Sequence, residues 1–324
     1  MSTKLSRASY TVVLVGATGG LGRDVANVFL TSYKPFFSRI IITARDTTTP
    51  EANSLAEKGA ELVLVSPLDP ATSFTKAFQG VDAVVNLLGA TSHEFKDAVG
   101  EAAIKSGVAV YFPPEFGTDH RINDFPGYDA ADWMFKGQHT RKYRQLGAGK
   151  TRVVSVYTGL FLENLIGAHF GFDTANLTYT SVGSSDAKIA TTAKADIGRA
   201  LAEFTLLTVN PETAASVPDD VHVAGNNVSY HEVRDIVQRV RAELGVQPAG
   251  EIKLQSVDLP AFKENLRKEH LEKPKPGLRD HLKVLIGEGK MDFSKNNNEL
   301  INPGQSIWKW KTVEDLVREK GGNV

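Results

Sequence analysis

The sequence predicts an α/β protein in which a Rossmann-like, doubly wound parallel sheet carries a smaller C-terminal α+β lobe. Two observations support this prediction: apolar runs alternate with helix-like stretches through the first half, and a glycine-rich turn follows the first run. With 324 residues the chain is long enough for about two domains, or for one large unit with an appended lobe. We place the sheet domain at residues 1–158 and the lobe at residues 159–324, and expect residues 185–225 to extend the sheet domain.

Six apolar, β-branched runs make up the predicted sheet, at residues 10–16, 39–44, 61–65, 82–89, 108–113 and 151–157. Their apolar character is continuous rather than alternating, which is typical of parallel strands covered by helices on both faces. After the first run, Val25, Val28 and Phe29 repeat with helical spacing, and a second amphipathic turn begins at Leu55 and ends at Gly59. Strands that alternate with helices indicate right-handed βαβ crossovers.

The pattern loosens after the sixth run. We predict helices over residues 159–170 and 194–207 and strands over residues 176–182 and 220–225, followed by two or three further helices. Thr312 and Asp315 can cap a last helix. The segment 271–280, which contains prolines and a glycine, is typical of an ordered connection. Trp308 and Trp310 are expected to anchor the C-terminal segment onto the lobe.

The composition excludes several classes of function. A net charge of −1, from 37 basic and 38 acidic side chains, gives no reason to expect a nucleic acid or an anionic membrane as partner. The chain has no cysteine, which excludes disulfides, thiolate nucleophiles and cysteine-ligated metals. The polar start has no signal-like apolar segment, and no run approaches the roughly 18 apolar residues that cross a bilayer. We expect a cytoplasmic monomer or homodimer that binds a small molecule.

Three glycines follow the first apolar run in the stretch "VGATGGLGRD", where a buried strand turns into a helix. Gly16 permits the tight turn, Gly19 lets the backbone approach a pyrophosphate, and Gly22 lets the helix pack close to the strand. The N-terminus of the helix supplies N–H groups and a positive dipole. A glycine-rich loop without a ligand is the alternative, which the flanking strand and helix weaken. We therefore predict a dinucleotide site.

The end of the second apolar run indicates which dinucleotide binds. Arg45 lies there, about 23 residues beyond Gly22. An arginine accommodates the 2′-phosphate of NADP, whereas a carboxylate would hold the 2′-hydroxyl of NAD. NADPH is favoured. Asp46 leaves NADH open, because a shift of one residue would bring its carboxylate to that position, and a surface pair of Arg45 and Asp46 is a further alternative.

A reductase also needs an acid or base near the nicotinamide. None of the eight tyrosines has a lysine four residues further on, so the Tyr-x-x-x-Lys pair of common short-chain dehydrogenases is absent. The histidines, including His93 in "SHEF", lack metal-ligand spacing, and no metal is expected. An oxidoreductase with this sequence must use a different proton donor.

Four segments carry a family resemblance: "GATGGLG" after the first strand, "RD" after the second, "PPEFGTD" after the fifth and "WMFKGQHTRKY" entering the next helix. In order and spacing they resemble the NmrA-like and isoflavone-reductase-like group of atypical short-chain dehydrogenases. That group includes phenylcoumaran benzylic ether, pinoresinol-lariciresinol and isoflavone reductases. The resemblance covers roughly the first half of the chain well and the lobe more loosely, and the ending "NPGQSIWKWKTVEDLV" is similar to fungal members.

The resemblance implies NADPH (NADP+) as the cofactor and a cleft between the Rossmann-like domain and a substrate lobe. In the family's reductases, the lysine that matches Lys136 is the catalytic residue. The expected cofactor-binding residues are Gly16, Thr18, Gly19, Gly20, Leu21, Gly22, Arg45, Leu88, Gly89, Pro113 and Lys136. The expected substrate-binding residues are Glu115, Phe116, Phe161 and Leu162.

Chemistry supports Lys136 as well, because an ammonium on the helix after the fifth strand would face the ligand-binding edge of the sheet. Partial burial would lower its pKa and make it a general acid or base. Capping of the loop before Gly117 is an equal alternative role for Glu115, and core packing explains Phe161 about as well as substrate contact. Pro114 replaces the family's usual serine, and Ser66 with Pro67 replaces a frequent Gly-Asp.

The leading hypothesis is an NADPH-dependent reductase of a small aromatic or conjugated substrate of the benzylic ether, quinone-methide or enone type. In this hypothesis, Lys136 protonates or polarises the developing oxyanion. One alternative is a non-catalytic, NADP(H)-sensing regulator of the NmrA type. Such regulators lack the active-site lysine, so Lys136 favours the enzyme. A second alternative is an isomerase or dehydratase that recycles its cofactor.

Overall fold

The computed structural model describes residues 10–125, 128, 130–273 and 278–324. The first half contains β1 (Tyr10–Val15), α1 (Gly20–Leu30), β2 (Phe37–Ala44), α2 (Pro50–Glu57), β3 (Glu61–Leu64), α3 (Pro70–Ala77), β4 (Ala83–Asn86), α4 (His93–Ser106), β5 (Val110–Phe112), α5 (Ala131–Gly147), β6 (Arg152–Val153) and β7 (Ser155–Tyr157). The second half contains β8 (Leu160–Phe161), α6 (Leu162–Leu165), β9 (Phe172–Asp173), β10 (Thr178–Val182), β11 (Ile189–Thr192), α7 (Lys194–Val209), β12 (Asp220–His222), β13 (Asn226–Val228), α8 (Tyr230–Leu244), β14 (Lys253–Val257), α9 (Leu259–Glu272), α10 (Arg279–Gly287), α11 (Asn298–Ile301) and α12 (Val313–Glu319).

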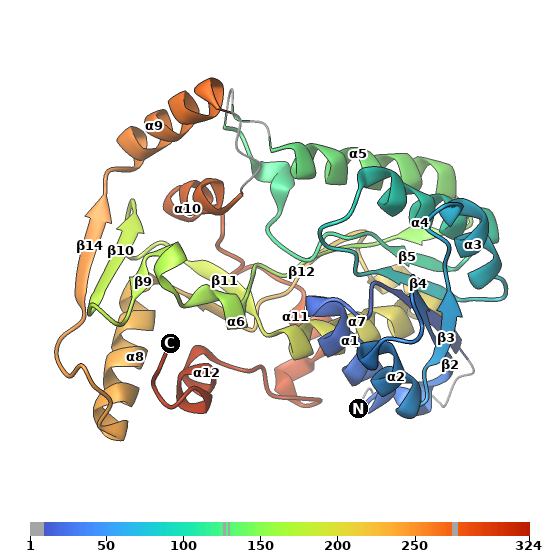
Figure 1. Cartoon of the computed structure of the whole chain (residues 1–324), viewed down its shortest axis with the longest axis horizontal. Coiled ribbons are helices and arrows are strands. Elements are labelled where there is room, and N and C mark those ends of the chain that lie inside the picture. The colour runs from blue at the N-terminus through green and yellow to red at the C-terminus, as the bar shows by residue number, and fades with distance from the viewer. Residues whose placement is uncertain (1–9, 126–127, 129, 274–277) are drawn as a thin grey trace.

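The central sheet has six parallel strands in the order β3-β2-β1-β4-β5-β6. The chain winds in one direction from β1 to β3 and in the other from β4 to β6, so the order reverses between β1 and β4. Helices α3, α4 and α5 cover one face of the sheet, and α1, α2 and α7 cover the other (Figure 1). The predicted α/β, Rossmann-like doubly wound fold is confirmed.

The two faces of β1 show why its apolar run is continuous. Val12 and Leu14 point into the core that contains α1 and α7, whereas Val13 and Val15 point into the core that contains α3 and α4. All four side chains are buried. A strand with helices on both faces has no solvent-facing side, so polar residues do not alternate with apolar ones.

The C-terminal lobe is built on two small sheets, with strand orders β14-β10-β9 and β13-β11-β8. Its core includes a stacked pair of rings, Phe172 and Tyr230, whose centroids are 4.4 Å apart. Two elements from this half of the chain lie against the sheet domain. Helix α7 packs on α1, where a Cβ on Gly198 would lie 3.1 Å from the Cα of Val25, and β12 pairs in parallel with β7.

The helix expected over residues 159–170 is wrong. Leu160 and Phe161 form β8 and pair with β11, and the helix that follows is only the short α6. Gly159 explains the change, because its φ is +63° and an added Cβ would lie 2.2 Å from the Ala190 carbonyl oxygen. The backbone at Gly159 therefore packs directly against β11, in a conformation that a right-handed helix does not contain. Strands β11, β13 and β14 were not predicted.

The two C-terminal tryptophans belong to the core of the sheet domain and not to the core of the lobe, onto which they were expected to anchor the C-terminal segment. Trp308 and Trp310 pack edge to face, with ring centroids 4.9 Å apart, against the core that contains α1 and α7. The next residue, Lys311, donates its backbone N–H to Asp196 of α7 at 2.7 Å, which fixes the segment there. The predicted capping box of Thr312 and Asp315 begins α12. Residues 274–277 of the expected connection lie outside the described residues.

Candidate active site

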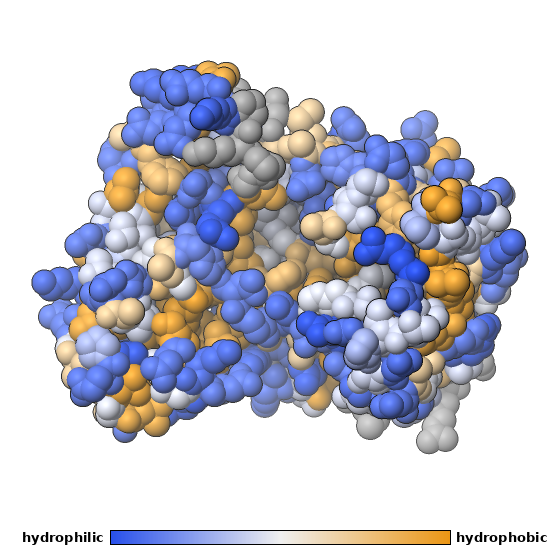
Figure 2. All heavy atoms as spheres, viewed as in Figure 1, coloured by the Kyte–Doolittle hydropathy of each residue, from blue (hydrophilic) through white to orange (hydrophobic). Residues whose placement is uncertain are grey.

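A cavity of about 420 Å³ opens at the carboxyl ends of the central strands. Its walls come from the glycine turn after β1, the end of β2, the loops after β4 and β5, helix α5 and β8. The predicted residues that line it are Gly16, Thr18, Gly19, Gly20, Leu21, Arg45, Leu88, Gly89, Glu115, Phe116, Lys136 and Phe161. Apolar residues are visible in the hollow between the sheet domain and the lobe (Figure 2). Open parallel sheets bind ligands at this edge, beside the reversal in strand order.

Three predicted site residues do not line the cavity. Gly22 lies under the turn, where an added Cβ would be 2.1 Å from the Gly16 carbonyl oxygen. Pro113 is buried and does not line the cavity, whereas its neighbour Pro114 does. Leu162 is fully buried in the core of the C-terminal lobe, because α6 turns it away from the cavity and leaves Phe161 as the lining residue.

The glycine turn leaves room for a ligand's phosphates. Gly16 has φ +81°, and an added Cβ would lie 3.1 Å from the backbone of Leu87 and Leu88. Helix α1 begins at Gly20 and has no side-chain cap and no acidic residue in its first turn. The amides at this helix end are therefore not covered by a side chain, and they can donate hydrogen bonds to an anion in the cavity.

Gly22→Ala is expected to destabilise the fold by about 3 kcal/mol or more, because the new Cβ would be forced into the backbone of Gly16 and Ala17. Gly20→Ala is the matched control, since in the described structure its Cβ would meet no tertiary neighbour within 4 Å. Urea unfolding without added ligand measures both variants. Equal stability of the two variants would contradict the close packing of the turn.

The neighbours Arg45 and Asp46 have different surroundings. Arg45 lines the cavity, whereas Asp46 does not. The Asp46 Oδ1 atom accepts hydrogen bonds from the Thr48 hydroxyl at 2.7 Å and the Thr48 amide at 2.8 Å. These two hydrogen bonds lower the pKa of Asp46. They also hold its carboxylate in the local turn that Asp46 forms with Thr48. At the end of β2, the Arg45 guanidinium is therefore available to a ligand in the cavity, whereas the Asp46 carboxylate is not.

Lys136 lies half-buried on α5, and its Nζ atom donates a hydrogen bond to the Glu115 carbonyl oxygen at 2.6 Å. Burial lowers the pKa of Lys136, and the nearby ammonium of Lys96 lowers it further. The carboxylates of Glu115 and Asp132 act in the opposite direction, and burial is the larger effect. Lys136 is thus an ammonium in the cavity that gives up its proton more readily than an exposed lysine.

The carboxylate of Glu115 holds the loop after β5. Its Oε2 atom contacts His120 Nε2 at 3.0 Å, and its Oε1 atom accepts from the Thr140 hydroxyl at 2.9 Å. Burial raises the pKa of Glu115, but the His120 contact and the charge of Lys136 more than offset it, so the pKa of Glu115 is lowered from its ordinary value. His120 and Thr140 were not predicted from the sequence as partners of Glu115. Thr140 lies one helical turn after Lys136, and this spacing was the signal that could have placed it on the same face of the helix as Lys136, near Glu115.

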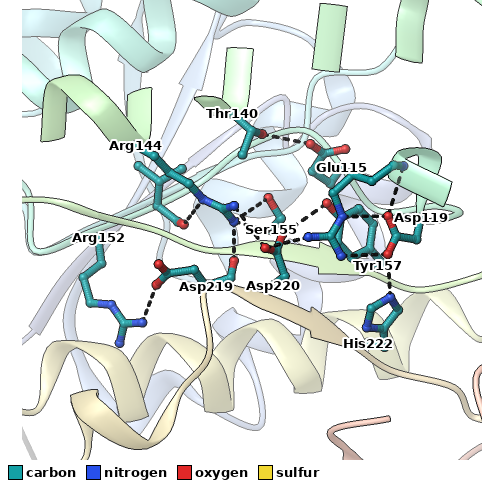
Figure 3. Close-up of polar contacts among 12 residues, drawn as sticks. Glu115, Asp119, Thr140, Arg144, Arg152, Ser155, Tyr157, Asp219, Asp220 and His222 are labelled. Carbon is teal, nitrogen blue, oxygen red and sulfur yellow. Dashed lines mark hydrogen bonds and ion pairs between the residues drawn. The ribbon is translucent and has the colours of Figure 1, made fainter. Parts of the chain in front are cut away.

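A polar network fixes the far side of this loop to β12 (Figure 3). Asp119 accepts from Arg121 at 2.7 Å and contacts His222 at 3.0 Å. Burial raises the pKa of Asp119, but these two partners outweigh it and hold the pKa well below its ordinary range. Asp220 on β12 joins the network through ion pairs with Arg121 and Arg144. The loop that carries Glu115 is therefore held on both sides.

The fold and this cavity define an α/β protein of the Rossmann-like class, with a lysine beside the cavity at the carboxyl ends of its strands. The model of the NmrA-like family matches residues 8–249, and the chain belongs to that family. Within the described residues, no group of three or more histidines and carboxylates could hold a metal ion, and no helix is long and apolar enough to cross a membrane.

Two curated relatives and one solved structure show what the chain is similar to. An NmrA-like family domain-containing oxidoreductase of Gibberella moniliformis is 31% identical over 166 residues, 49% of this chain and 51% of the relative. The chain thus spans about half the length of that relative. Phenylcoumaran benzylic ether reductase PT1 of Pinus taeda is 26% identical over 229 residues, 68% of this chain and 72% of the relative.

The solved structure is the binary complex of leucoanthocyanidin reductase and NADPH from Vitis vinifera. It has a TM-score of 0.68 and 20% sequence identity, and the match covers 96% of this chain and 99% of that one. At this identity the similarity shows the shared fold.

Proposed function

We propose that this oxidoreductase uses NADPH to reduce a small aromatic or conjugated molecule of the benzylic ether, quinone-methide or enone type. The observation that carries the proposal is that Lys136 lines the same cavity as the uncapped glycine turn and Arg45. The names of the two curated relatives, an oxidoreductase and a benzylic ether reductase, support the reaction class. The NADPH in the leucoanthocyanidin reductase structure supports a nicotinamide cofactor of this kind.

The residues of the cavity fit such a cofactor in three places. The amides at the start of α1 would hold the pyrophosphate, and Arg45 would hold the 2′-phosphate. The loops after β4 and β5, from Leu88 to Gly89 and from Pro114 to Phe116, would flank the nicotinamide end. When bound, the cofactor supplies the hydride.

Lys136 would supply the proton. Its Nζ atom is anchored by the Glu115 carbonyl, which leaves its other N–H groups for a substrate oxygen. A protonated Nζ stabilises negative charge that develops on that oxygen, and its lowered pKa eases the transfer of the proton. Phe116 and Phe161 offer apolar faces on the same cavity for an aromatic ring.

Consumption of NADPH with a panel of aryl enones, quinones and benzylic ethers tests this proposal. The expected result is turnover with at least one substrate class and a change in the product that matches the NADPH consumed. Tight NADPH binding without turnover across the panel would favour the sensing regulator. Product formation without net NADPH loss would favour the isomerase or dehydratase.

Replacing Lys96 with methionine is expected to raise the pKa of Lys136, because it removes a nearby positive charge that disfavours the ammonium form. Lys96 on α4 is buried, its ammonium lies 5.7 Å from the centre of the Phe135 ring, and its charge disfavours a second ammonium at Lys136. Glu115 and Asp132, the carboxylates that favour the charged form of Lys136, remain in the variant. The acidic form of Lys136 would then persist to higher pH.

Competitive labelling of lysines across a pH series, read by mass spectrometry of the Lys136 peptide, measures this shift without any substrate. Lys96→Arg keeps the charge and serves as the matched control, with a pKa for Lys136 close to that of the wild type. If Lys136 titrates identically in the methionine and arginine variants, the influence of Lys96 is refuted.

A further inference from the structure

A chain of buried hydrogen bonds connects the outside of the sheet domain to the wall of the cavity. The Leu88 N–H donates to Asn86 Oδ1 at 3.2 Å, and Asn86 Nδ2 donates to the Tyr111 hydroxyl at 3.0 Å. The Tyr111 oxygen lies 2.7 Å from His139 Nε2, and His139 Nδ1 lies 2.6 Å from Asp97 Oδ1. The chain thus crosses from α4 and α5 through β5 and β4 to the loop after β4.

The partners are consistent with one direction for every bond in this chain. Asp97 only accepts, so His139 carries a proton on Nδ1, and with His139 as the neutral imidazole its Nε2 accepts the Tyr111 hydroxyl proton. The Tyr111 oxygen is then free to accept from the amide of Asn86, whose carbonyl faces the Leu88 N–H. Each of the three middle side chains is almost completely buried, so none can replace a lost partner with bulk water.

The end of the chain lies in the cofactor cavity. Residues 87–91 all line that cavity, and Leu88 is the residue whose amide Asn86 holds. The opposite side of the same loop rests against Gly16, where a Cβ would lie 3.1 Å from the Leu88 nitrogen. The loop is therefore held between the glycine turn and the Asn86 side chain.

We infer that Asp97, His139, Tyr111 and Asn86 are positioning residues that hold the loop 87–91 in the conformation that binds the cofactor. None of the four lines the cavity, so they act through the Leu88 backbone and not by touching the ligand. The inference rests on the proposed function for the identity of the ligand, NADPH. It also makes helices α4 and α5, which supply Asp97 and His139, part of the binding apparatus.

Tyr111→Phe tests the inference because it removes one oxygen and leaves the ring. The variant deprives both Asn86 and His139 of a partner. Tyr143→Phe is the matched control: Tyr143 is also buried and packs against Tyr111, but its hydroxyl donates to the backbone oxygen of Asp97 and makes none of the four hydrogen bonds of the chain. Both variants lose one buried hydroxyl, so both should lose similar stability.

The measurements are amide hydrogen exchange of the peptide that contains residues 87–91, without ligand, and the Kd for NADPH. We expect exchange at Leu88 to become about fivefold to tenfold faster in Tyr111→Phe and the Kd to rise by a similar factor. Tyr143→Phe should stay within about twofold of the wild type in both measurements. Identical behaviour of the two variants would overturn the inference.

A second variant covers the case in which Tyr111→Phe does not fold. Asp97→Ala removes the half-exposed carboxylate at the outer end of the hydrogen-bond chain. This carboxylate is the acceptor that orients His139. Faster exchange at residues 87–91 in this variant would support the inference, and unchanged exchange would refute it. If the wild type does not bind NADPH at all, the proposed function fails. The exchange data still decide whether the hydrogen-bond chain from Asp97 to Asn86 holds the loop 87–91.

Discussion

Lys136→Ala is expected to lower kcat by about 100-fold to 10,000-fold while NADPH binding changes by less than about threefold. The variant removes the ammonium that Glu115 anchors in the cavity, so no group in its place can protonate the substrate oxygen. The glycine turn and Arg45, which we propose hold the phosphates of the cofactor, are unchanged in this variant. The cofactor should therefore still bind, and the loss should fall on the chemical step.

Single-turnover rates and NADPH fluorescence titrations separate these two effects. Lys105→Ala, which removes an exposed lysine from α4, is the control for the loss of a positive charge and should keep full activity. Lys136→Ala that turns over as fast as the wild type would show that another group supplies the proton. A variant that no longer binds NADPH would instead place Lys136 mainly in cofactor binding.

Arg45→Ala is expected to raise the Kd for NADPH by about 10-fold to 100-fold and to leave the Kd for NADH within about twofold. A guanidinium forms charge-assisted hydrogen bonds to a 2′-phosphate, and NADH has no such group. Arg45 lines the cavity at the end of β2, where this phosphate would lie. The variant should therefore lose its preference for NADPH and not its ability to bind a dinucleotide.

Asp46→Ala is the matched control for this experiment. The Asp46 carboxylate is held by Thr48 and does not line the cavity, so neither cofactor should bind differently by more than about twofold. Titration of both variants with both cofactors gives four binding constants. Weaker NADH binding in Asp46→Ala would show that Asp46 contacts the ribose and that the enzyme accepts NADH.

The sheet domain could be predicted because its signals are local. Each of the six sheet strands overlaps one of the six mainly apolar runs, and the glycine turn and the helices follow within a few residues. The C-terminal lobe depends on pairings between distant residues, such as Leu160 with Thr191 and Tyr179 with Leu254. No local pattern encodes these pairings. An apolar segment such as residues 159–170 therefore resembles a helix until its partner strand is known.

The residues of the candidate site likewise fall into those that a local pattern predicts and those that depend on contacts between distant segments. The glycines and Arg45 follow from spacing, because the turn after the first strand is a contiguous motif. Lys136 stood out only through the family resemblance, since a lysine on a helix is ordinarily solvent-facing. The partners of Lys136 and Glu115, and the chain from Asp97 to Asn86, join side chains from several elements. Residue spacing carries no signal for such contacts, because packing of the sheet brings them together.

The most direct test of the account is to follow the hydride itself. NADPH that carries deuterium on the transferred position at C4 is incubated with the enzyme and the substrate that turns over fastest, and the product is analysed by mass spectrometry. If the protein is a reductase, one deuterium should appear on a carbon of the product for each NADPH consumed. Bound NADPH with no deuterium in any product of the panel would contradict the assignment as a reductase.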